Sequence, residues 1–514
     1  MSISTAISVD RVSRVVGYKI KKGVFGGGET PNLPMRIAVL GQGNSANEAT
    51  YDETPFEFTD ARAVGKKYGY GSMLHLIARI LRPPSGNLLG GIVTEVYPQK
   101  APTMSSPSIK MLDVTLGGAN PTANTTHKVV IGGRDSVDGE SYAFSVLATD
   151  DADGIKQRIV DSVNGVLGSP VTAAIESGGE ISFTTKWNGL NTVDFDIRID
   201  VGSNDAGVIY AVGTATDGTG TPEILDSLIA FGEKWNTIVI NPYGEEVFDV
   251  LEQFNGVPDP DVPTGRYDPI VFKPFVALFG NKDNKAVDVT TITDAKARQD
   301  QVTNVLCPAP NTEAFVFEAA ANMAVTTALI THNTPHLGNG GRSYPDMPIP
   351  LNSNIGEFAS YSVRDQLAKK GSSTVTLENG KYTVQDFITT YHPDGEYPPK
   401  FRKVRDLAID WNISFGWMII MKRDILDKAL VADDVPLRVD NVVSPKDAKQ
   451  LAYSYILQKA AQALIIDPDF SQESVEVGVN ASVPNRLDVK FRYKRSSTAD
   501  IVSTDVEVDF AFSL

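Results

Sequence analysis

The chain has 514 residues, of which 42% are hydrophobic and 21% are charged, values typical of a soluble folded protein. Its formal net charge of −16 disfavours binding to phosphate backbones over a broad face, so direct nucleic-acid binding is not expected. The single cysteine, Cys307, excludes an internal disulfide framework and is typical of a protein folded in a reducing cytoplasm. One hydrophobic core cannot organise a chain of this length, so several domains are expected.

The amino-terminal sequence has no cationic start followed by an apolar block, so it predicts no signal peptide. Apolar runs such as 417–421 are much shorter than the ~20 residues that a membrane-spanning helix needs. Membrane insertion is therefore not expected. Residues 1–28 are predicted to form an arm with a flexible root, because short apolar pieces lead into a glycine-rich joint at 23–28.

An apolar run at 37–40 leads into Gly41-Gln42-Gly43-Asn44-Ser45-Ala46, which matches the G-x-G-x-x-A pattern of a dinucleotide-binding turn. In such a turn the pyrophosphate lies at the N-terminus of the helix that follows. Residues 47–55 show no helical spacing of apolar residues, and Pro55 disfavours helical angles at Thr54. The pattern therefore favours a strand followed by a surface loop, with no nicotinamide or flavin cofactor.

Helical spacing of apolar residues next predicts a helix within 59–82, ended by Pro83. Residues 104–222 are rich in Thr, Ser, Gly, Asn and Asp, and short strand-like pieces recur around one helix near 154–167, which indicates an inserted β-rich domain. From 223 onwards helices and strands alternate, which predicts a mainly parallel sheet. The predicted helices lie at 223–235, 245–254, 294–301 and 314–330, and the predicted strands at 237–241, 271–279 and 304–307.

Later segments include a hairpin around Asn379-Gly380 and two helices near 401–429 and 444–464. At the end of the chain, residues 501–514 alternate apolar and polar side chains, which predicts a half-buried strand. Its partner within the subunit is predicted to be 487–493, with 494–500 closing the hairpin. The residues expected to form an inter-subunit strand are Val506, Val508, Phe510, Phe512 and Leu514.

Patterns that carry catalytic or metal chemistry are missing or incomplete. No phosphate loop, H-E-x-x-H or G-x-S-x-G motif occurs. Pro335 separates His332 from His336, and the acidic run at 149–154 lacks the ligands of a calcium loop, so it is better explained as a helix cap. Cys307, before Pro308, is expected to be a buried inert thiol. No catalytic, cofactor-binding or metal-binding residue is predicted.

Five longer stretches are distinctive: AVGKKYGYGSMLHLIARI (63–80), DPIVFKPFVALFGNKDN (268–284), TNVLCPAPNTEAFVFEAAAN (303–322), HLGNGGRSYPDMPIP (336–350) and STVTLENGKYTVQDFITTYHPDGEYPPKFRKVRDLAIDWNISFGW (373–417). They resemble the contractile tail sheath subunit of Mu-type bacteriophages, in the myophage tail sheath family. The resemblance spans most of the chain from about 36 to 465 and is weakest over 104–222.

The resemblance implies a structural protein, not an enzyme, that needs no cofactor. Such subunits stack as hexameric rings around a tail tube and contract on a signal from the baseplate, driving the tube through the host envelope. The implied partners are copies of the chain itself, the tail tube protein, and the baseplate and tail terminator proteins. The implied location is the virion tail, after assembly in the host cytoplasm. Terminal arms that exchange strands between neighbouring subunits are also implied.

The expected fold class is α/β, or α+β over the whole chain, in a multidomain arrangement. The expected segments are an arm (1–28), an α/β sheath core (29–103 plus 223–350), an inserted β-rich outer domain (104–222), a tube-proximal domain (351–485) and C-terminal strands (486–514). The family suggests an inward-facing helix, for which the candidate is 444–464. There Lys446, Lys449 and Lys459 either contact an acidic tube or form an ordinary solvated face.

Three alternatives remain open at this point. The chain could form the sheath of a phage-tail-like injection particle. It could instead be a Rossmann-type oxidoreductase, which the α/β rhythm and the Gly41–Gly43 pattern would allow. A capsid or baseplate component is the third alternative.

Overall fold

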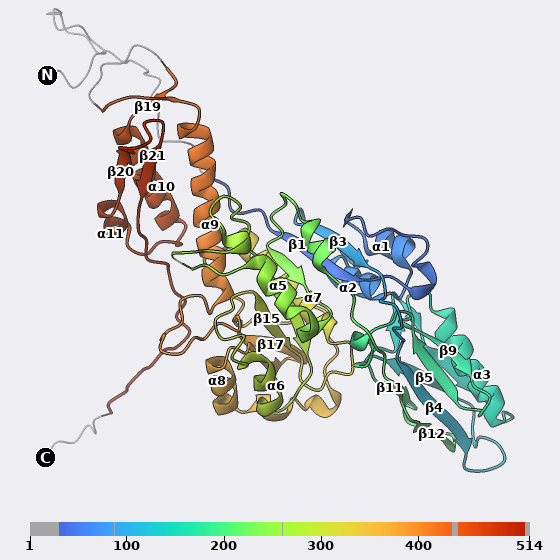
Figure 1. Cartoon of the computed structure of the whole chain (residues 1–514). Helices are drawn as coiled ribbons and strands as arrows, with labels where there is room; N and C mark the ends of the chain where they lie inside the picture. The colour runs from blue at the N-terminus through green and yellow to red at the C-terminus, as the bar shows by residue number, and fades with distance from the viewer. Residues whose placement is uncertain (1–29, 87, 260, 434–439, 509–514) are drawn as a thin grey trace, which may run out of the picture. The chain divides into compact units, whose positions relative to one another are not determined.

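The computed structural model describes residues 30–86, 88–259, 261–433 and 440–508 (Figure 1). They form two compact units, one of residues 34–408 and a smaller one of 30–33 together with the described residues from 409 onwards. The division lies inside one helix, whereas the sequence predicts boundaries after 350 and after 485. Residues 351–408 belong to the larger unit because their hairpin is bonded into it, as the hydroxyl of Tyr382 donates to the carbonyl of Pro310 at 2.8 Å. The predicted arm at 1–28 lies outside the described residues.

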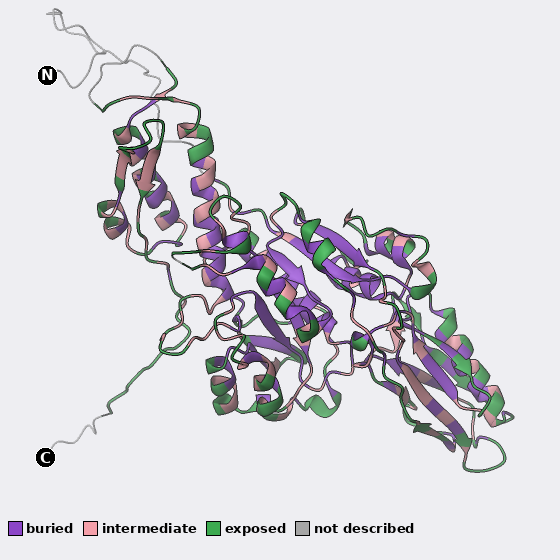
Figure 2. Ribbon diagram, viewed as in Figure 1, coloured by how far each residue is buried: buried purple, intermediate pink, exposed green. Residues whose placement is uncertain are grey.

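A six-stranded sheet forms the centre of the larger unit. Five of its strands are parallel and the edge strand β2 runs antiparallel to β3, which confirms the predicted α/β core. Strand β1 is buried from Ile37 to Gln42, as expected for a parallel strand covered on both faces (Figure 2). The strands in spatial order are β15 (Asn304–Pro308), β14 (Val276–Asn281), β13 (Ile238–Ile240), β1 (Arg36–Gln42), β3 (Val93–Gln99) and β2 (Phe56–Phe58).

The helices of this unit differ in several places from those the sequence predicts: α8 is not predicted, and the helix expected at 223–235 is the shorter α4. The helix expected within 59–82 is two helices, because Gly69 and Gly71 take positive φ angles of 96° and 76° between them. The prediction of a helix at 294–301 is wrong, because the helix in this region is α6, which ends at Thr293. The carboxylate of Asp294 is held by two side chains: Oδ2 lies 2.9 Å from Nζ of Lys370, and Oδ1 lies 2.9 Å from Nε2 of His392. The helices are α1 (Ala61–Tyr68), α2 (Met73–Leu81), α4 (Leu225–Ile229), α5 (Phe248–Asn255), α6 (Ala286–Thr293), α7 (Phe317–Asn333) and α8 (Tyr361–Lys369).

The predicted hairpin is confirmed as β16 (Thr374–Glu378) paired with β17 (Lys381–Asp386). Asn379 and Gly380 both take positive φ angles, 51° and 71°, as a two-residue hairpin turn requires. Short 3₁₀ turns connect several elements of the unit: η1 (Ser45–Asn47), η2 (Leu190–Thr192), η3 (Gly244–Val247), η4 (Gly265–Tyr267), η5 (Leu351–Ser353) and η6 (Gly356–Ala359).

Residues 104–222, here termed the insert, are rich in β-structure, as their composition indicates. Helix α3 (Ala152–Gly165) packs on them, and its N-terminus is capped by Asp151, whose carboxylate accepts from Gly154 N–H at 2.8 Å. This cap accounts for the acidic run at 149–154. One sheet has the order β12 (Val208–Val212), β4 (Ile109–Leu116), β10 (Ile181–Thr185), β9 (Val171–Ile175); a second has β11 (Ile197–Asp200), β5 (Thr125–Ile131), β8 (Ala143–Val146); and β6 (Ser136–Val137) pairs with β7 (Glu140–Ser141).

The smaller unit is built on two long helices. On α9, Ile409, Ile413 and Trp417 return every four residues and pack against α10, which begins at a capping box formed by Ser444 and Asp447. No helix in the described ranges combines the length and apolarity needed to cross a membrane. The elements are α9 (Val404–Ile420), a π turn η7 (Met421–Ile425), β18 (Ala429–Leu430), β19 (Val442–Val443), α10 (Pro445–Ala461), α11 (Pro468–Glu473), β20 (Glu476–Val479) and β21 (Leu487–Lys490).

Candidate functional site

The glycine turn after β1 is filled by the protein's own groups. Gly43 N–H donates to the hydroxyl of Tyr51 at 3.1 Å, and Gly41 N–H donates to Oε1 of Gln99 at 2.6 Å. Only the three-residue turn η1 follows the strand, in place of the helix that would hold a pyrophosphate. These contacts occupy the donors that a dinucleotide needs, so the Gly41–Gly43 pattern no longer supports the oxidoreductase alternative.

The other residues considered for chemistry lie apart or are buried. Helix α7 ends at Asn333, between His332 and Pro335, so the two histidines of that stretch do not share a helical face. Cys307 is fully buried in β15, and burial raises the pKa of its thiol well above the usual value. In the part of the chain that the structure describes, no group of three or more His, Cys, Asp or Glu side chains could hold a metal ion.

The partner predicted for the C-terminal strand is wrong. Residues 487–490 form β21, which pairs antiparallel with β20 and not with the described residues 501–508. The hairpin is closed by the local loop 480–486, where Asn480 N–H donates to the carbonyl of Arg486 at 2.8 Å. Val477 of β20 and Val489 of β21 both pack against the core of the smaller unit, and this shared buried face favours the local partner.

The β20–β21 hairpin covers the core of the smaller unit with one face. Val489, Phe491 and Tyr493 pack toward that core, and the ring of Phe491 lies 5.5 Å from the ring of Trp417 on α9. The hydroxyl of Tyr493 donates to Oδ1 of Asp410 at 2.8 Å. The opposite face is solvent-exposed and carries Lys490 and Arg492.

Each strand of this hairpin has an open edge among the described residues. In an antiparallel pair, alternate residues direct their main-chain N–H and C=O groups to the partner strand. Arg492 N–H donates to Oγ of Ser474 at 2.7 Å, so the even-numbered residues of this strand face β20. Val489 and Phe491 therefore direct their main-chain N–H and C=O groups away from β20, to the side where no described strand pairs with them. This edge can accept a further strand.

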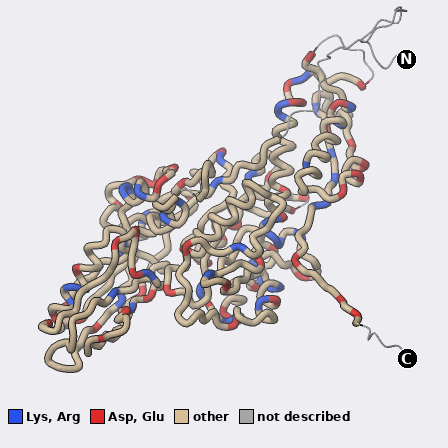
Figure 3. The backbone as a smooth tube through the Cα atoms, turned by 180° about the vertical axis from the view of Figure 1, so that it is seen from behind, with Lys and Arg blue, Asp and Glu red and all other residues tan. Residues whose placement is uncertain are grey.

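The C-terminal segment has the complementary property, since it is an extended chain that pairs with no described strand. Residues 499–508 belong to no strand, and the exposed fractions of Ile501, Val502, Val506 and Val508 are 87%, 78%, 77% and 78%. The segment runs out from the smaller unit and carries acidic side chains (Figure 3). The other residues of the predicted inter-subunit strand, Phe510, Phe512 and Leu514, lie outside the described residues.

The three candidate lysines of α10 differ in position. Lys446 is exposed, and Lys449 is half-buried with its ammonium 5.6 Å from the ring centre of Tyr453. Lys459 is fully buried, with Nζ 3.0 Å from Oε1 of Gln462, so the prediction of a surface contact through Lys459 is wrong. Burial lowers the pKa of Lys459 to about 8. The stripe of Ala452, Tyr455, Ile456 and Lys459 has helical spacing, and this signal in the sequence places the lysine on the core side.

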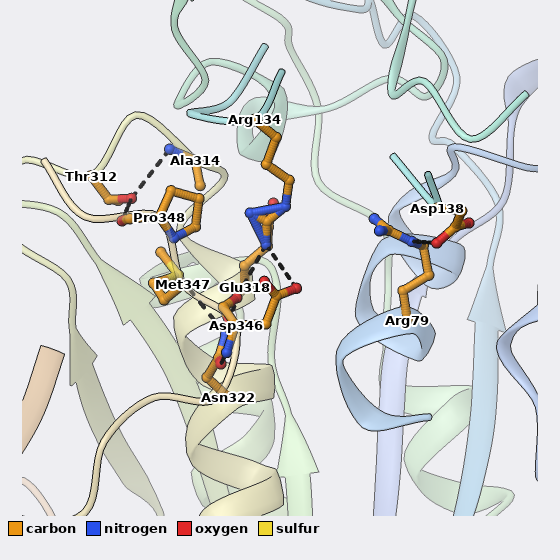
Figure 4. A network of polar contacts seen from close by, with 10 residues as sticks. All are labelled: Arg79, Arg134, Asp138, Thr312, Ala314, Glu318, Asn322, Asp346, Met347 and Pro348. Atoms are coloured by element: carbon orange, nitrogen blue, oxygen red, sulfur yellow. Dashed lines mark hydrogen bonds and ion pairs between the residues drawn. The ribbon is translucent and has the colours of Figure 1, made fainter. Parts of the chain in front are cut away.

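A polar junction that the sequence does not reveal joins the insert to α2 and α7 (Figure 4). Arg134, in the turn after β5, binds Oε2 of the buried Glu318 at 2.6 Å and Oδ2 of Asp346 at 3.2 Å. Asn322 on α7 accepts from Asp346 N–H at 2.7 Å, and Arg79 on α2 binds Asp138 at 2.7 Å. Single charged residues in turns give no pattern, so only the folded structure shows these pairs.

An apolar contact reinforces the junction. The ring of Trp187, in the insert, lies 5.1 Å from the ring of Phe315 and 6.1 Å from that of Phe317. Phe195 stacks on Phe315 at 5.0 Å, and all four rings are almost completely buried. The insert is therefore packed against the core of the larger unit through a continuous aromatic cluster.

No protein-family model and no curated protein sequence matches this chain. Among solved structures, it is similar to a sheath tail protein from Desulfitobacterium hafniense, with 13% identity, coverage of 94% of this chain and 100% of that one, and a TM-score of 0.43. A sheath tail protein from Listeria innocua shares 12% identity over 92% of this chain and 93% of that one, with a TM-score of 0.45. The PVC sheath of an extracellular contractile injection system, in its contracted state, shares 9% identity with this chain. The match covers 97% of this chain and 99% of that one, with a TM-score of 0.45. At these values the likeness decides neither activity nor partners.

Proposed function

We propose that this chain is the structural subunit of a contractile tail sheath of the Mu-type family that its sequence resembles. In this role it polymerises as stacked hexameric rings around a tail tube and contracts to drive the tube through a host envelope. The sheath of a phage-tail-like injection particle would use the same subunit chemistry. The role needs no catalysis, which fits a glycine turn whose N–H groups are bonded within the chain.

The observation that carries the proposal is the exposed segment 501–508. Exposed apolar side chains that alternate along an extended chain are costly in an isolated subunit and are typical of strands that pair with another chain. The open edge of the β20–β21 hairpin provides a place for such a strand on a second copy. Main-chain hydrogen bonds across this contact would keep neighbouring subunits linked while the angle between the subunits changes during contraction.

The remaining parts of the subunit have roles in the same proposal. The insert would lie on the outer surface of the sheath, and the exposed Lys446 with Lys449 would be available to an acidic tube. The tail tube, baseplate and tail terminator proteins are the proposed partners, and the assembled protein belongs to the virion tail. Contraction would be driven by the burial of additional apolar surface between subunits, which contributes ~25 cal/mol of free energy per Å².

Electron microscopy of the purified protein tests the proposal. The full chain is expected to form long hollow cylinders in negative stain. A chain truncated after Asp500 is expected to keep the melting temperature of the full chain but to remain as single subunits, since the removed segment is exposed. A full chain that never forms cylinders over a range of concentrations, salt and polymer crowding would overturn the proposal.

A further inference from the structure

An apolar groove, here termed the α4–α5 groove, opens on the surface of the larger unit between α4, α5 and the segment after η4. Its volume is about 490 Å³, and its lining includes Leu225, Val250, Phe254 and Val271. Leu225 and Val271 are exposed, and Ile229, one helical turn after Leu225, extends the apolar surface. Exposed apolar surface of this kind is typical of a site that another protein covers.

The lining of the groove suits an aromatic ring. Arg266, which is buried, contributes to this lining, and its guanidinium donates to the carbonyl of Lys273 at 2.8 Å and to that of Lys234 at 2.7 Å. The guanidinium carbon also lies 5.6 Å from the ring centre of Phe254. A further ring that entered the groove would meet an aromatic side chain and a fixed cation, and both attract aromatic rings.

The elements around the groove are acidic. Residues 223–254, which carry α4 and α5, contain seven acidic residues and one basic residue, Lys234. Lys234 is already paired with Glu95 of β3. Glu223 and Asp226, on either side of Leu225 in the sequence, are exposed. Because charges across an interface are arranged to complement each other, an occupant of this groove should be basic as well as aromatic.

The Tyr397 loop, residues 397–403, has both properties. Tyr397 is 89% exposed, and Pro398, Pro399 and the exposed Lys400 follow it. Exposed aromatic side chains are frequent anchors of protein interfaces. The two prolines restrict the backbone, so less conformational freedom is lost when the loop docks. The loop contains three basic residues and no acidic residue.

Acidic residues just before the loop do not cancel its charge. Asp394 binds Lys296 at 2.9 Å. The carboxylate of Glu396 accepts from the hydroxyl of Tyr391 at 3.0 Å. With three basic and two acidic residues, the stretch 394–403 remains net positive.

We infer that the Tyr397 loop of one copy of this chain docks in the α4–α5 groove of a second copy. The inference rests on the proposed polymerisation and adds a contact that is separate from strand exchange. Both surfaces belong to the larger unit, so every subunit carries one loop and one groove. Pairing of two different surfaces is heterologous, and its repetition gives closed rings or open helical stacks. The ring of Tyr397 fills the apolar groove, and Lys400 approaches the acidic rim beside Asp226.

Cysteine crosslinking tests the contact, because Cys307 is the single cysteine of the chain and is fully buried. The full chain with L225C and Y397C, assembled into cylinders and treated with a short bismaleimide, is expected to give a ladder of covalent dimers, trimers and longer oligomers. A mixture of the two single-cysteine chains is expected to give covalent dimers only. The matched control is I209C with Y397C, in which the first cysteine lies at an exposed site of the insert, and it should give no ladder.

Assembly gives a second readout. Y397S, and separately L225K with I229K, are each expected to reduce the fraction of protein in cylinders at least tenfold, by sedimentation and negative stain. Their melting temperatures should stay within a few degrees of the native value, because the altered side chains are exposed. The control is I209K with V212K, at sites 55% and 61% exposed against 48% and 59% for Leu225 and Ile229, and it should assemble normally.

The outcomes separate this inference from the proposed function. A native chain that never forms cylinders overturns the proposed function and the inference with it. Cylinders in which L225C and Y397C do not crosslink between chains overturn the inference alone. A crosslink within one chain would show that the loop fills its own groove, and covalent dimers alone from the double variant would show a closed pair; each result contradicts a propagating contact. Normal assembly of both Y397S and L225K with I229K would show that the contact is not used.

Discussion

Arg134 of the insert and Glu318 of α7 form an ion pair in which Nη2 lies 2.6 Å from Oε2, and only 6% of the Glu318 side chain is exposed. Burial raises the pKa of the Glu318 carboxyl, and the guanidinium of Arg134 opposes this effect. The same guanidinium binds the carboxylate of Asp346. The backbone N–H of Asp346 in turn donates to the side chain of Asn322 on α7. One arginine thus links the insert to two parts of the core.

The first prediction concerns this arginine. Arg134→Ala should lower the free energy of unfolding of the larger unit by ~3–5 kcal/mol, because it leaves a buried carboxylate without its partner. Adding Glu318→Gln should recover part of the loss. The control is Lys128→Ala, which breaks an exposed pair with Asp135 and should cost at most ~1 kcal/mol. Urea denaturation measures all three, and equal losses for Arg134→Ala and Lys128→Ala would contradict the ion-pair assignment.

The aromatic cluster predicts that the insert cannot be removed freely. Deleting 104–222 removes Trp187 and Phe195 from the buried faces of Phe315 and Phe317. We expect the deletion to give a protein with a lower melting temperature that exposes apolar surface to a fluorescent dye. Trp187→Ala alone should cost ~3–5 kcal/mol. A deletion protein as stable as the full chain would show that the cluster contributes little.

The parts of the fold that local patterns determine could be predicted from the sequence. Strands such as β1 and β15 contain short unbroken apolar runs, and the Asn379-Gly380 pair favours the positive φ angles of a two-residue hairpin turn. The sequence does not predict helix α6, because its β-branched residues (AVDVTTIT) are poor helix formers. The segment after it is held by tertiary contacts of Asp294, which the local sequence does not reveal.

Pairing between distant segments could not be predicted in the same way. Strand β20, with Gly478 among only four residues, shows a weak alternation, so the sequence suggests a partner for β21 further along the chain. The Arg134–Glu318 pair joins residues 184 positions apart and leaves no periodic trace. Such contacts depend on how whole elements pack, which the local sequence does not specify.

Lys459 predicts an unusual dependence of stability on pH. Its pKa is lowered by burial to about 8 in the folded unit, below the usual value of 10.5 that applies to the unfolded chain. The unfolded chain then binds more protons between these values, so the contribution of this group to stability rises as pH increases from about 8 to 10.5. Below this window the cost of burying the charge is present in full.

Lys459→Met tests this dependence. The variant should be more stable than the native chain at pH 7, by up to ~3 kcal/mol, and the difference should shrink between pH 8 and 10.5. Thermal unfolding followed by circular dichroism gives the difference at each pH, which cancels the titration of other groups. Lys446→Met, at an exposed site of the same helix, is the control and should show no such trend. A constant difference across the pH range would contradict a titrating buried lysine.

The last prediction separates stability from assembly at the C-terminal segment. Val506→Lys with Val508→Lys should leave the melting temperature of the subunit unchanged, because these side chains are 77% and 78% exposed and have no partner strand among the described residues. The same change should abolish cylinders, since each valine would lose ~2 kcal/mol of burial in the proposed contact and a charge would enter its apolar face. The control is Leu457→Lys with Ile466→Lys, which places two lysines at sites of the same unit that are 51% and 59% exposed, and it should still assemble. Negative stain and differential scanning calorimetry provide the two readouts. A parallel loss of melting temperature and cylinders in the valine variant would mean that the segment stabilises its own subunit, and the strand-exchange proposal would then fail.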